Sequence, residues 1–317
     1  MAGGDGHGES TAAILAAFTA NIGIAIAKFV GFLVTGSSSL LAESVHSVAD
    51  AGNQGLLALG GYRARRPPSP LHPFGYGRSR YFYAFIVAVV LFSLGGLFAI
   101  YEGWHKVTDP HEISSPAVAF GILGVAIALE AFALRTAMRH ARRPKGKRSW
   151  IRYIRTSRSP ELPVLLLEDS AALVGLVFAT LGIALSLLTG NPVWDGVGTL
   201  AIGGLLVVVA IVLALEMHSL LLGEAADPAT LARIEAAIAD GPEVRSLIHV
   251  LTQHIGPEEL LVAAKVEFDP NLTTAGLATA IDAAEARIRE SVPIAKVLYL
   301  EPDLVAARPA PATVADS

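Results

Sequence analysis

The chain contains no cysteine among its 317 residues, and charged residues make up only 16% of it. Without cysteine, neither a disulfide nor a thiolate metal site can form, so a bound metal must be held by His, Asp, Glu, Asn or backbone oxygen. The low charge, together with 53% hydrophobic residues, excludes an ordinary soluble enzyme of this length. These proportions predict a membrane protein.

Basic residues are also scarce in the last third of the chain. Residues 224–303 contain 14 acidic and 6 basic residues, a net charge of −8, which argues against nucleic acid as a partner. The N-terminal segment MAGGDGHGES lacks the basic region of a signal peptide, and the apolar run behind it is longer than a signal peptide's. We therefore expect a flexible N-terminus over residues 1–10, followed by a first membrane span.

Long apolar runs define most of the predicted spans. A bilayer core about 30 Å thick requires about 20 mostly apolar residues per helix. Five stretches meet this requirement: 12–34, 81–101, 116–134, 170–189 and 196–215. A sixth, 40–61, is interrupted by Glu43, His46, Asp50 and Asn53, but their spacing of 3, 4 and 3 residues places them on one helix face. A bundle can bury such a stripe, so we predict an all-α domain of six transmembrane helices over residues 11–222.

The loop charges predict the orientation of these spans. Residues 62–80 contain five Arg and residues 135–158 contain ten Lys or Arg, whereas the turns near Gly36 and Gly190 have none nearby. The positive-inside rule places both basic loops in the cytoplasm. With six spans, both termini are cytoplasmic as well. We expect a multi-pass protein of the cell (inner) membrane.

After Gly223 the pattern becomes that of a small soluble domain. Asp227 followed by Pro228 is typical of a helix start, and apolar residues continue at helical spacing to residue 238. Segments 244–252, 260–268 and 296–300 are typical of strands, with a second helix over 277–288. We predict a cytoplasmic αββαβ domain of ferredoxin-like or metallochaperone-like type over 223–303, small enough to favour a homodimer, and a disordered tail over 304–317.

Two polar clusters lie where the sequence predicts lipid. His46 and Asp50 are four residues apart on one helix face, so an imidazole and a carboxylate can converge on one ion. Glu168 and Asp169 begin the fifth span. Counting about 1.5 Å per residue, Asp50 and Asp169 lie within about one helical turn of equal depth. We therefore predict a cation site near the midplane that includes His46, Asp50 and Asp169.

Structural alternatives exist for each of these residues. His46 and Asp50 could form a hydrogen-bonded pair with no ligand, and Asp169 could have a structural role too. Glu168 points about 100° away from Asp169 and could instead be an interfacial carboxylate facing the basic loop. Glu43 lies nearer the outer end of its span, where a vestibule residue is as good an interpretation as a ligand.

Other ionisable residues favour structural interpretations. Lys28 and Glu130 are both intramembrane, and a buried ion pair between them would satisfy both charges. His249 and His254 are five residues apart in or near a strand, a weak spacing for metal, so we expect surface histidines.

Four motifs, in order, resemble the cation diffusion facilitator family of zinc and related divalent-metal transporters: SLLAESVHSVAD, HPFGYGRSR, LLLEDSAALVG and LTGNPVWDGVGTL. The resemblance covers residues 11–303, including the six spans and the αββαβ tail. It is closest to the subgroup of the mitochondrial zinc transporter 9 type and its bacterial relatives.

The resemblance implies a tetrahedral site with two ligands in the second span and two in the fifth. The first pair corresponds to His46 and Asp50, and the fifth-span aspartate to Asp169. The position four residues before Asp169 is Leu165, so the fourth ligand departs from the family pattern. Water, Glu168, Asn53 or a backbone group could replace it.

Two further metal sites of the family are expected to be incomplete here. The loop site retains His72, but Tyr76 occupies the second histidine position. In the soluble domain His249 lies near an expected ligand, whereas Leu300 and Pro302 occupy the last strand region. We therefore do not expect a binuclear site there.

The predicted function is export of divalent metal, foremost Zn²⁺, from the cytoplasm in exchange for protons. A metal ligand must be deprotonated, so metal and protons compete for the imidazole and carboxylates. Alternatives are a carrier of Mn, Fe, Co, Ni or Cd, and a membrane-anchored metal sensor or scaffold without flux. The sequence has no His-Glu-x-x-His or Ser/His constellation, and we expect neither an enzyme nor a cofactor beyond the transported ions.

Overall fold

The computed structural model describes residues 21–304. Within them the chain forms two compact units: one comprises the chain up to Arg63 and Ser79–His218, the other Ala64–Arg78 and the chain from Ser219. The predicted flexible ends, 1–10 and all but the first residue of 304–317, lie outside the described residues. We describe each unit by itself.

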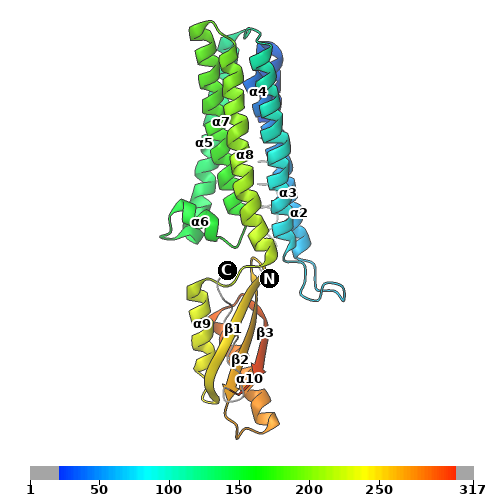
Figure 1. The fold of residues 1–317 in the computed structure, drawn as a ribbon, viewed down its shortest axis with the longest axis vertical. Helices are drawn as coiled ribbons and strands as arrows, with labels where there is room; N and C mark the ends of the chain where they lie inside the picture. The colour runs from blue at the N-terminus through cyan, green and yellow to red at the C-terminus, as the bar shows by residue number, and fades with distance from the viewer. Residues whose placement is uncertain (1–20, 305–317) are drawn as a thin grey trace, which may run out of the picture. The chain divides into compact units, whose positions relative to one another are not determined.

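The first unit is a bundle of long helices (Figure 1). Four are long and apolar enough to cross a membrane: Ser79–Thr108, Pro116–Lys145 (α5), Glu161–Thr189 (α7) and Val193–Leu222 (α8). Each contains its predicted span and extends beyond it at one end or both, but α5 begins at the predicted residue 116 and α7 ends at the predicted residue 189. The other two bundle helices are the described part of the first predicted span, Asn21–Thr35, and the more polar α2 (Ser38–Ala64). The six-span count stays a prediction because the first helix extends into residues that are not described.

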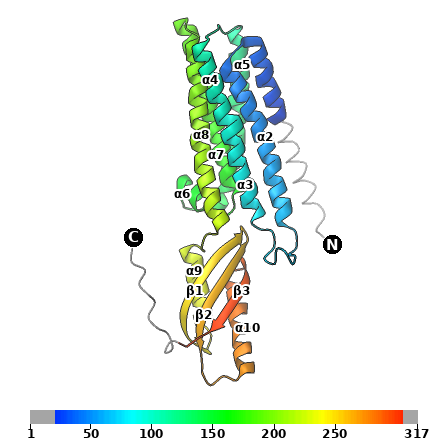
Figure 2. The same ribbon diagram turned by 45° about the vertical axis from the view of Figure 1, so that its right-hand side comes forward.

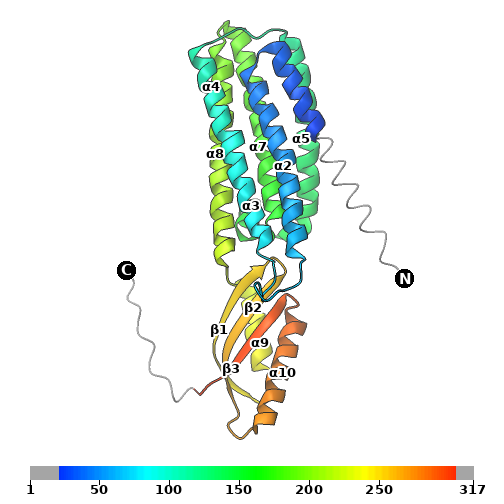
Figure 3. The ribbon, with the colours of Figure 1, turned by 90° about the vertical axis from the view of Figure 1, so that its right-hand side faces the viewer.

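The polar helix α2 is held inside the bundle by contacts on several sides. Figures 2 and 3 both show it between α3 (Ser79–Val90) and the helix Asn21–Thr35. Gly60 lies so close to Tyr83 that an added Cβ would be 2.9 Å from the tyrosine Cβ, and Gly175 of α7 lies against Glu43. The predicted stripe is buried as a result, since Glu43, His46 and Asn53 all have little or no exposure.

A buried carboxylate joins the start of α2 to α8. Asp195 accepts hydrogen bonds from the hydroxyl of Ser37 at 2.9 Å and the backbone N–H of Ser38 at 2.9 Å. The Nζ of Lys106 lies 3.9 Å from this carboxylate and donates to the carbonyls of Gly36 and His111. A negative charge at a helix N-terminus is favourable, so Asp195 both starts α2 and fixes its position against α8.

The span Ser79–Thr108 is not a uniform α-helix. Its middle, η1 (Leu91–Leu97), is a π-helix, and α4 (Phe98–Thr108) follows it. Glycines allow this segment to approach α8 closely: a Cβ added at Gly203 would meet the backbone N of Ile100 at 2.8 Å and the carbonyl of Gly96 at 3.1 Å. Small residues permit such close helix packing in membranes. The apolar run predicted a helix but not this local widening.

The second unit contains the predicted αββαβ order. Its elements are α9 (Pro228–Ala239), β1 (Val244–Gly256), β2 (Glu259–Phe268), α10 (Thr274–Ser291) and β3 (Ala295–Pro302). β1 pairs antiparallel with β2, and β2 pairs parallel with β3; Figure 2 shows the three strands side by side. In β2 every second residue is buried, as the alternation predicts. The Asp227 side chain caps α9 at the predicted start by accepting from two backbone N–H groups.

The structure corrects two expectations about irregular regions. The basic segment 135–158 is not simply a loop, because α5 runs to Lys145 and a short helix α6 (Trp150–Thr156) follows, capped by the Ser149 hydroxyl. His254 is not a surface histidine: it lies at the end of β1 with 4% exposure. It is buried because the strand continues to Gly256, beyond its predicted end.

Candidate metal site in the helix bundle

The predicted pair on α2 is formed. His46 Nε2 lies 3.5 Å from Asp50 Oδ2, as the i,i+4 spacing requires. The His46 side chain is 1% exposed, and neither ring nitrogen has a hydrogen-bond partner within the described residues; the same holds for Asp50 Oδ1. Buried polar atoms are usually hydrogen-bonded. An imidazole and a carboxylate with unused lone pairs are suited to bind a cation.

Glu43, three residues before His46, is paired with a buried lysine. Lys28 donates to Glu43 Oε2 at 2.9 Å and to the Ser47 hydroxyl at 2.8 Å, and both charged side chains are fully buried. The expected Lys28–Glu130 pair is therefore wrong. Local spacing could not identify the partner of Lys28, because the choice depends on how α2 and α5 pack around the first helix.

The two acidic residues at the start of α7 both line a cavity. Glu168 is buried and accepts a hydrogen bond of 2.7 Å from the Asn53 side chain of α2. It does not behave as an interfacial carboxylate. Glu168 therefore also ties α7 to the polar stripe of α2.

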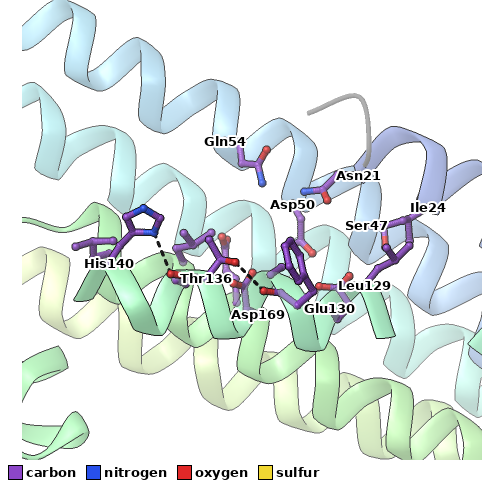
Figure 4. Close-up of a pocket in the computed structure, with 16 residues that line it drawn as sticks. Asn21, Ile24, Ser47, Asp50, Gln54, Leu129, Glu130, Thr136, His140 and Asp169 are labelled. Atoms are coloured by element: carbon purple, nitrogen blue, oxygen red, sulfur yellow. Dashed lines mark hydrogen bonds between the residues drawn. The ribbon is translucent and has the colours of Figure 1, made fainter. Parts of the chain in front are cut away.

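A cavity of about 620 Å³ brings the two predicted halves together. Asp50 of α2 and Glu168 and Asp169 of α7 all line it, as do Leu165 and, on α5, Glu130. Figure 4 shows the side chains of Asp50, Glu130 and Asp169 around the same space. The depth argument predicted that Asp50 and Asp169 lie within about one helical turn of equal depth, and both line this cavity.

The ligands are not drawn together in this conformation. Among residues 21–304, no group of three His, Asp or Glu side chains lies close enough to hold a metal ion. His46 and Asp50 form one half, and Asp169 faces it across the cavity. The metal site with His46, Asp50 and Asp169 stays a prediction, and the structure shows the cavity around which it would form.

Glu130 lines the cavity, although the sequence predicted that it would pair with Lys28. A pattern on α5 could have located it: the buried residues Ala119, Leu123, Ala126, Ala137 and Ala141 recur at three- and four-residue spacing, and Glu130 falls in the same series. That face of α5 packs against the bundle. A glutamate within it points inward, and not to lipid.

The other histidines considered as metal ligands, His72 and His249, lie in the second unit. His72 stacks on Tyr76 with ring centroids 4.5 Å apart, and Tyr76 OH lies 3.1 Å from the Ser69 hydroxyl. This tyrosine occupies the place where the family resemblance implies a second histidine. His249 is on β1, opposite Lys265 of β2, and a cation as neighbour does not favour metal binding at that position.

A bundle of apolar helices around an acidic cavity, followed by a small α+β unit, is the architecture of a membrane carrier for cations. The model of the cation efflux transmembrane domain family matches residues 14–222, which is more than half of the chain, so the chain belongs to this family. Its members are transporters and not enzymes.

Curated relatives carry names of zinc transport or of metal tolerance. The human "Proton-coupled zinc antiporter SLC30A9, mitochondrial" is 34% identical over 250 residues, 78% of this chain and 44% of its own length. "Metal tolerance protein C4" of Arabidopsis thaliana is 30% identical, over 82% of this chain and 58% of its own. The chain thus matches only about half the length of these relatives. "Zinc transporter ZitB" of Pectobacterium atrosepticum is 27% identical, over 82% of this chain and 78% of its own.

Solved structures are similar to part of the chain. A MamM CTD variant in its nickel form is 21% identical, with a TM-score of 0.23, over 24% of this chain and 96% of its own.

Proposed function

We propose that the protein moves divalent metal ions, with Zn²⁺ as the main substrate, across the cell membrane and out of the cytoplasm. The observation that carries the proposal is the cavity lined by Asp50 and Asp169 from two helices, beside the buried His46 with unused ring nitrogens. Imidazole and carboxylate together suit Zn²⁺. Membership of the cation efflux family and the names of the zinc-transporting relatives support the same substrate class.

The exchange of metal for protons follows from the ligand chemistry. An imidazole or carboxylate must be deprotonated to bind a metal ion, so each metal ion that enters the site displaces protons and each proton that enters weakens metal binding. We infer an antiport in which the cavity faces the two sides of the membrane alternately.

The direct test is zinc uptake into proteoliposomes that contain a pH dye and a zinc dye. The wild type is expected to take up zinc while the lumen loses protons, and Asp50→Ala and Asp169→Ala are expected to lose most of the flux. Asp109→Asn, an exposed carboxylate in a loop, is the matched control and should transport normally.

Each departure from this result has a distinct meaning. Retained flux in both alanine variants would remove His46, Asp50 and Asp169 as the site. Zinc movement without a change in luminal pH would exclude proton exchange. Binding of zinc without flux would favour the sensor or scaffold, and flux of Mn, Fe, Co, Ni or Cd in preference to zinc would change the substrate.

A homodimer is part of the proposal. One face of the sheet in the second unit carries exposed apolar residues in a single row: Leu251 of β1 pairs with Ala263 of β2, which pairs with Tyr299 of β3. Leu251 is 66% and Tyr299 58% exposed. Contiguous exposed apolar surface of this kind is typical of an interface between chains.

A further inference from the structure

The glutamate in the middle of α5 has no hydrogen-bond or ion-pair partner among residues 21–304. Glu130 lines the same cavity as Asp50 and Asp169, and within residues 21–304 its side chain forms no hydrogen bond or ion pair. Lys28, the buried cation that was expected to pair with Glu130, donates hydrogen bonds to Glu43 and Ser47 instead. A charge within the bilayer costs several kcal/mol, about 2.5–3.5 on insertion scales. A carboxylate at this depth without a protein partner points to a cationic ligand.

The cavity has an excess of negative charge. Asp50, Glu130, Glu168 and Asp169 come from three different helices, and no Lys or Arg is among the described residues that line it. The basic group in the lining, His140, has its Nδ1 2.9 Å from the carbonyl of Thr136. Four carboxylates around one space repel one another unless protons or a cation are bound.

A second observation, independent of the carboxylates, indicates that the ligand is a metal ion. His46 is almost fully buried, its Nε2 is directed at the Asp50 carboxylate at 3.5 Å, and neither ring nitrogen has a hydrogen-bond partner in the described part of the chain. A neutral imidazole offers one lone pair, and Zn²⁺ and similar ions are commonly bound by imidazole with carboxylates. His46 thus supplies a nitrogen ligand beside the carboxylates.

An ion with four ligands needs one donor besides His46, Asp50 and Asp169, and α7 supplies only Asp169 of these. Its side chain one turn before Asp169 is Leu165, which lines the cavity without a polar atom, and Glu168 is held by Asn53. His46, Asp50 and Asp169 account for three donors. α5 packs against α7, and Glu130 is the carboxylate that α5 contributes to the cavity lining.

We propose that Glu130 of α5 is the fourth donor of the transported metal ion, in place of a second residue on α7. The inference rests on the proposed function and identifies a residue of its site. The three carboxylate donors line a cavity of about 620 Å³, and His46 lies behind Asp50, so the ion draws α2, α5 and α7 together when it binds. Such a site is formed by the ion, which stabilises the closed arrangement over the open one.

The first test measures metal affinity. Zn²⁺ and Cd²⁺ are titrated into the purified full-length protein in detergent, by calorimetry, for the wild type, Glu130→Gln and Glu102→Gln. The control glutamate is on α4 and lies outside the cavity lining. Glu130→Gln is expected to bind at least ~10-fold more weakly, since even groups one step removed from a metal change affinity ~10–100-fold. Glu102→Gln should bind as the wild type does.

The second test moves the carboxylate to the other helix. Leu165 lines the same cavity one turn before Asp169, so Leu165→Asp in the Glu130→Gln background is expected to restore most of the lost affinity. Leu165→Asn, of similar size but neutral, should restore little. A purely structural role of Glu130 on α5 predicts no rescue from a residue on α7.

A third variant keeps the proposal testable if Glu130→Gln folds poorly. Glu130→His exchanges an oxygen donor for a nitrogen donor and is expected to lower the ratio of Mn²⁺ to Cd²⁺ affinity, because carboxylate suits Mn²⁺ and imidazole suits softer ions. This ratio is measured within one preparation, so a change in the folded fraction does not affect it.

The outcomes separate this inference from the proposed function. Wild-type affinity in Glu130→Gln, with affinity lost in Asp50→Ala and Asp169→Ala, would overturn the role of Glu130 and leave metal transport intact. Weak binding that Leu165→Asp does not rescue, together with an unchanged selectivity ratio in Glu130→His, would also overturn it. A wild-type protein that neither binds nor moves any divalent metal would instead refute the proposed function.

Discussion

The buried charges of the bundle fall into two groups that differ in whether the protein itself neutralises them. Lys28 with Glu43, and Lys106 with Asp195, are fully buried pairs that join helices. Asp50, Glu130 and Asp169 line a cavity and are not neutralised in this way. A buried charge that is paired within the protein stabilises the fold. A buried charge that faces a cavity without such a pair can bind a mobile ion.

The Lys28–Glu43 pair gives a prediction about stability. Lys28→Met leaves the buried Glu43 carboxylate without its cation, so the free energy of unfolding should fall by about 3–5 kcal/mol. Replacing both residues, as Lys28→Met with Glu43→Leu, should recover most of the loss because no buried charge remains. Denaturant unfolding of the detergent-solubilised protein, followed by tryptophan fluorescence, measures both changes.

The exposed Lys147 provides the control for that experiment. Lys147→Met removes the same charge at the surface and should change the free energy of unfolding by less than about 0.5 kcal/mol. If the double variant is as unstable as Lys28→Met, the pair is not the reason for the loss.

At the scale of elements, glycines decide how closely the helices approach. The π-helical middle of the Ser79–Thr108 span and α8 meet through Gly96 and Gly203, and α7 meets α8 through Gly182 and Gly198, whose added Cβ positions lie within 3.3 Å of the opposing glycine Cα. In lipid there is little hydrophobic drive between helices, so close van der Waals packing carries much of their association.

Two adjacent glycines of α8 provide a matched comparison. In Gly203→Ala the new methyl would lie 2.7 Å from Ile100 Cγ1 and 2.8 Å from the Ile100 backbone N, so we expect a loss of about 1–3 kcal/mol in stability from overpacking. In Gly204→Ala the methyl meets nothing within 4 Å, and helix propensity should add up to about 1 kcal/mol.

Thermal unfolding of the two variants in the same detergent should therefore shift in opposite directions. Equal shifts would show that the close approach of Gly203 to Ile100 does not limit the stability of the bundle.

At the scale of the whole molecule, the helix order assigns the loops to two ends of the bundle. The segments after α2 and after α5 share one end, and those after the helix Asn21–Thr35, after α4 and after α7 share the other. The basic residues lie in the first set of loops, and the segment 109–115 of the second set has acidic residues but no Lys or Arg. This asymmetry predicts the orientation.

The absence of native cysteine makes the orientation easy to test. Ser114→Cys and Lys147→Cys, both at exposed positions, introduce the chain's only thiol at opposite ends. With a membrane-impermeant maleimide, Ser114→Cys is expected to react in intact bacterial cells and Lys147→Cys only after permeabilisation. The reverse pattern would invert the proposed direction of transport.

The proposed dimer makes a prediction about mass. Leu251→Asp places a charge in the exposed apolar row of the sheet, so it should shift the protein from a dimer toward a monomer of 33.1 kDa. Leu71→Asp is the control, because Leu71 is 84% exposed in a loop of the same unit. Light scattering after size exclusion measures the mass, and an unchanged dimer in Leu251→Asp would remove this sheet face as the interface.

The sequence by itself determined the local elements, the family and half of the candidate site. Hydrophobic runs and period-two alternation specify helices and strands without reference to the rest of the chain, which is why the apolar helices of the bundle and the αββαβ order are as predicted. The pairing of His46 with Asp50 is equally local, since residues four apart share a helix face.

Only the tertiary structure decided which helices bring their polar residues together. Lys28 meets Glu43 and not Glu130, Asn53 engages Glu168, and Glu130 turns to the cavity. Each choice depends on the rotation and depth of one helix against another, and these are set by packing between residues up to 115 positions apart. Periodicity within a helix carries no information about that packing. The position of Glu130 at the cavity, on which the proposed fourth ligand rests, is therefore known only from the folded bundle.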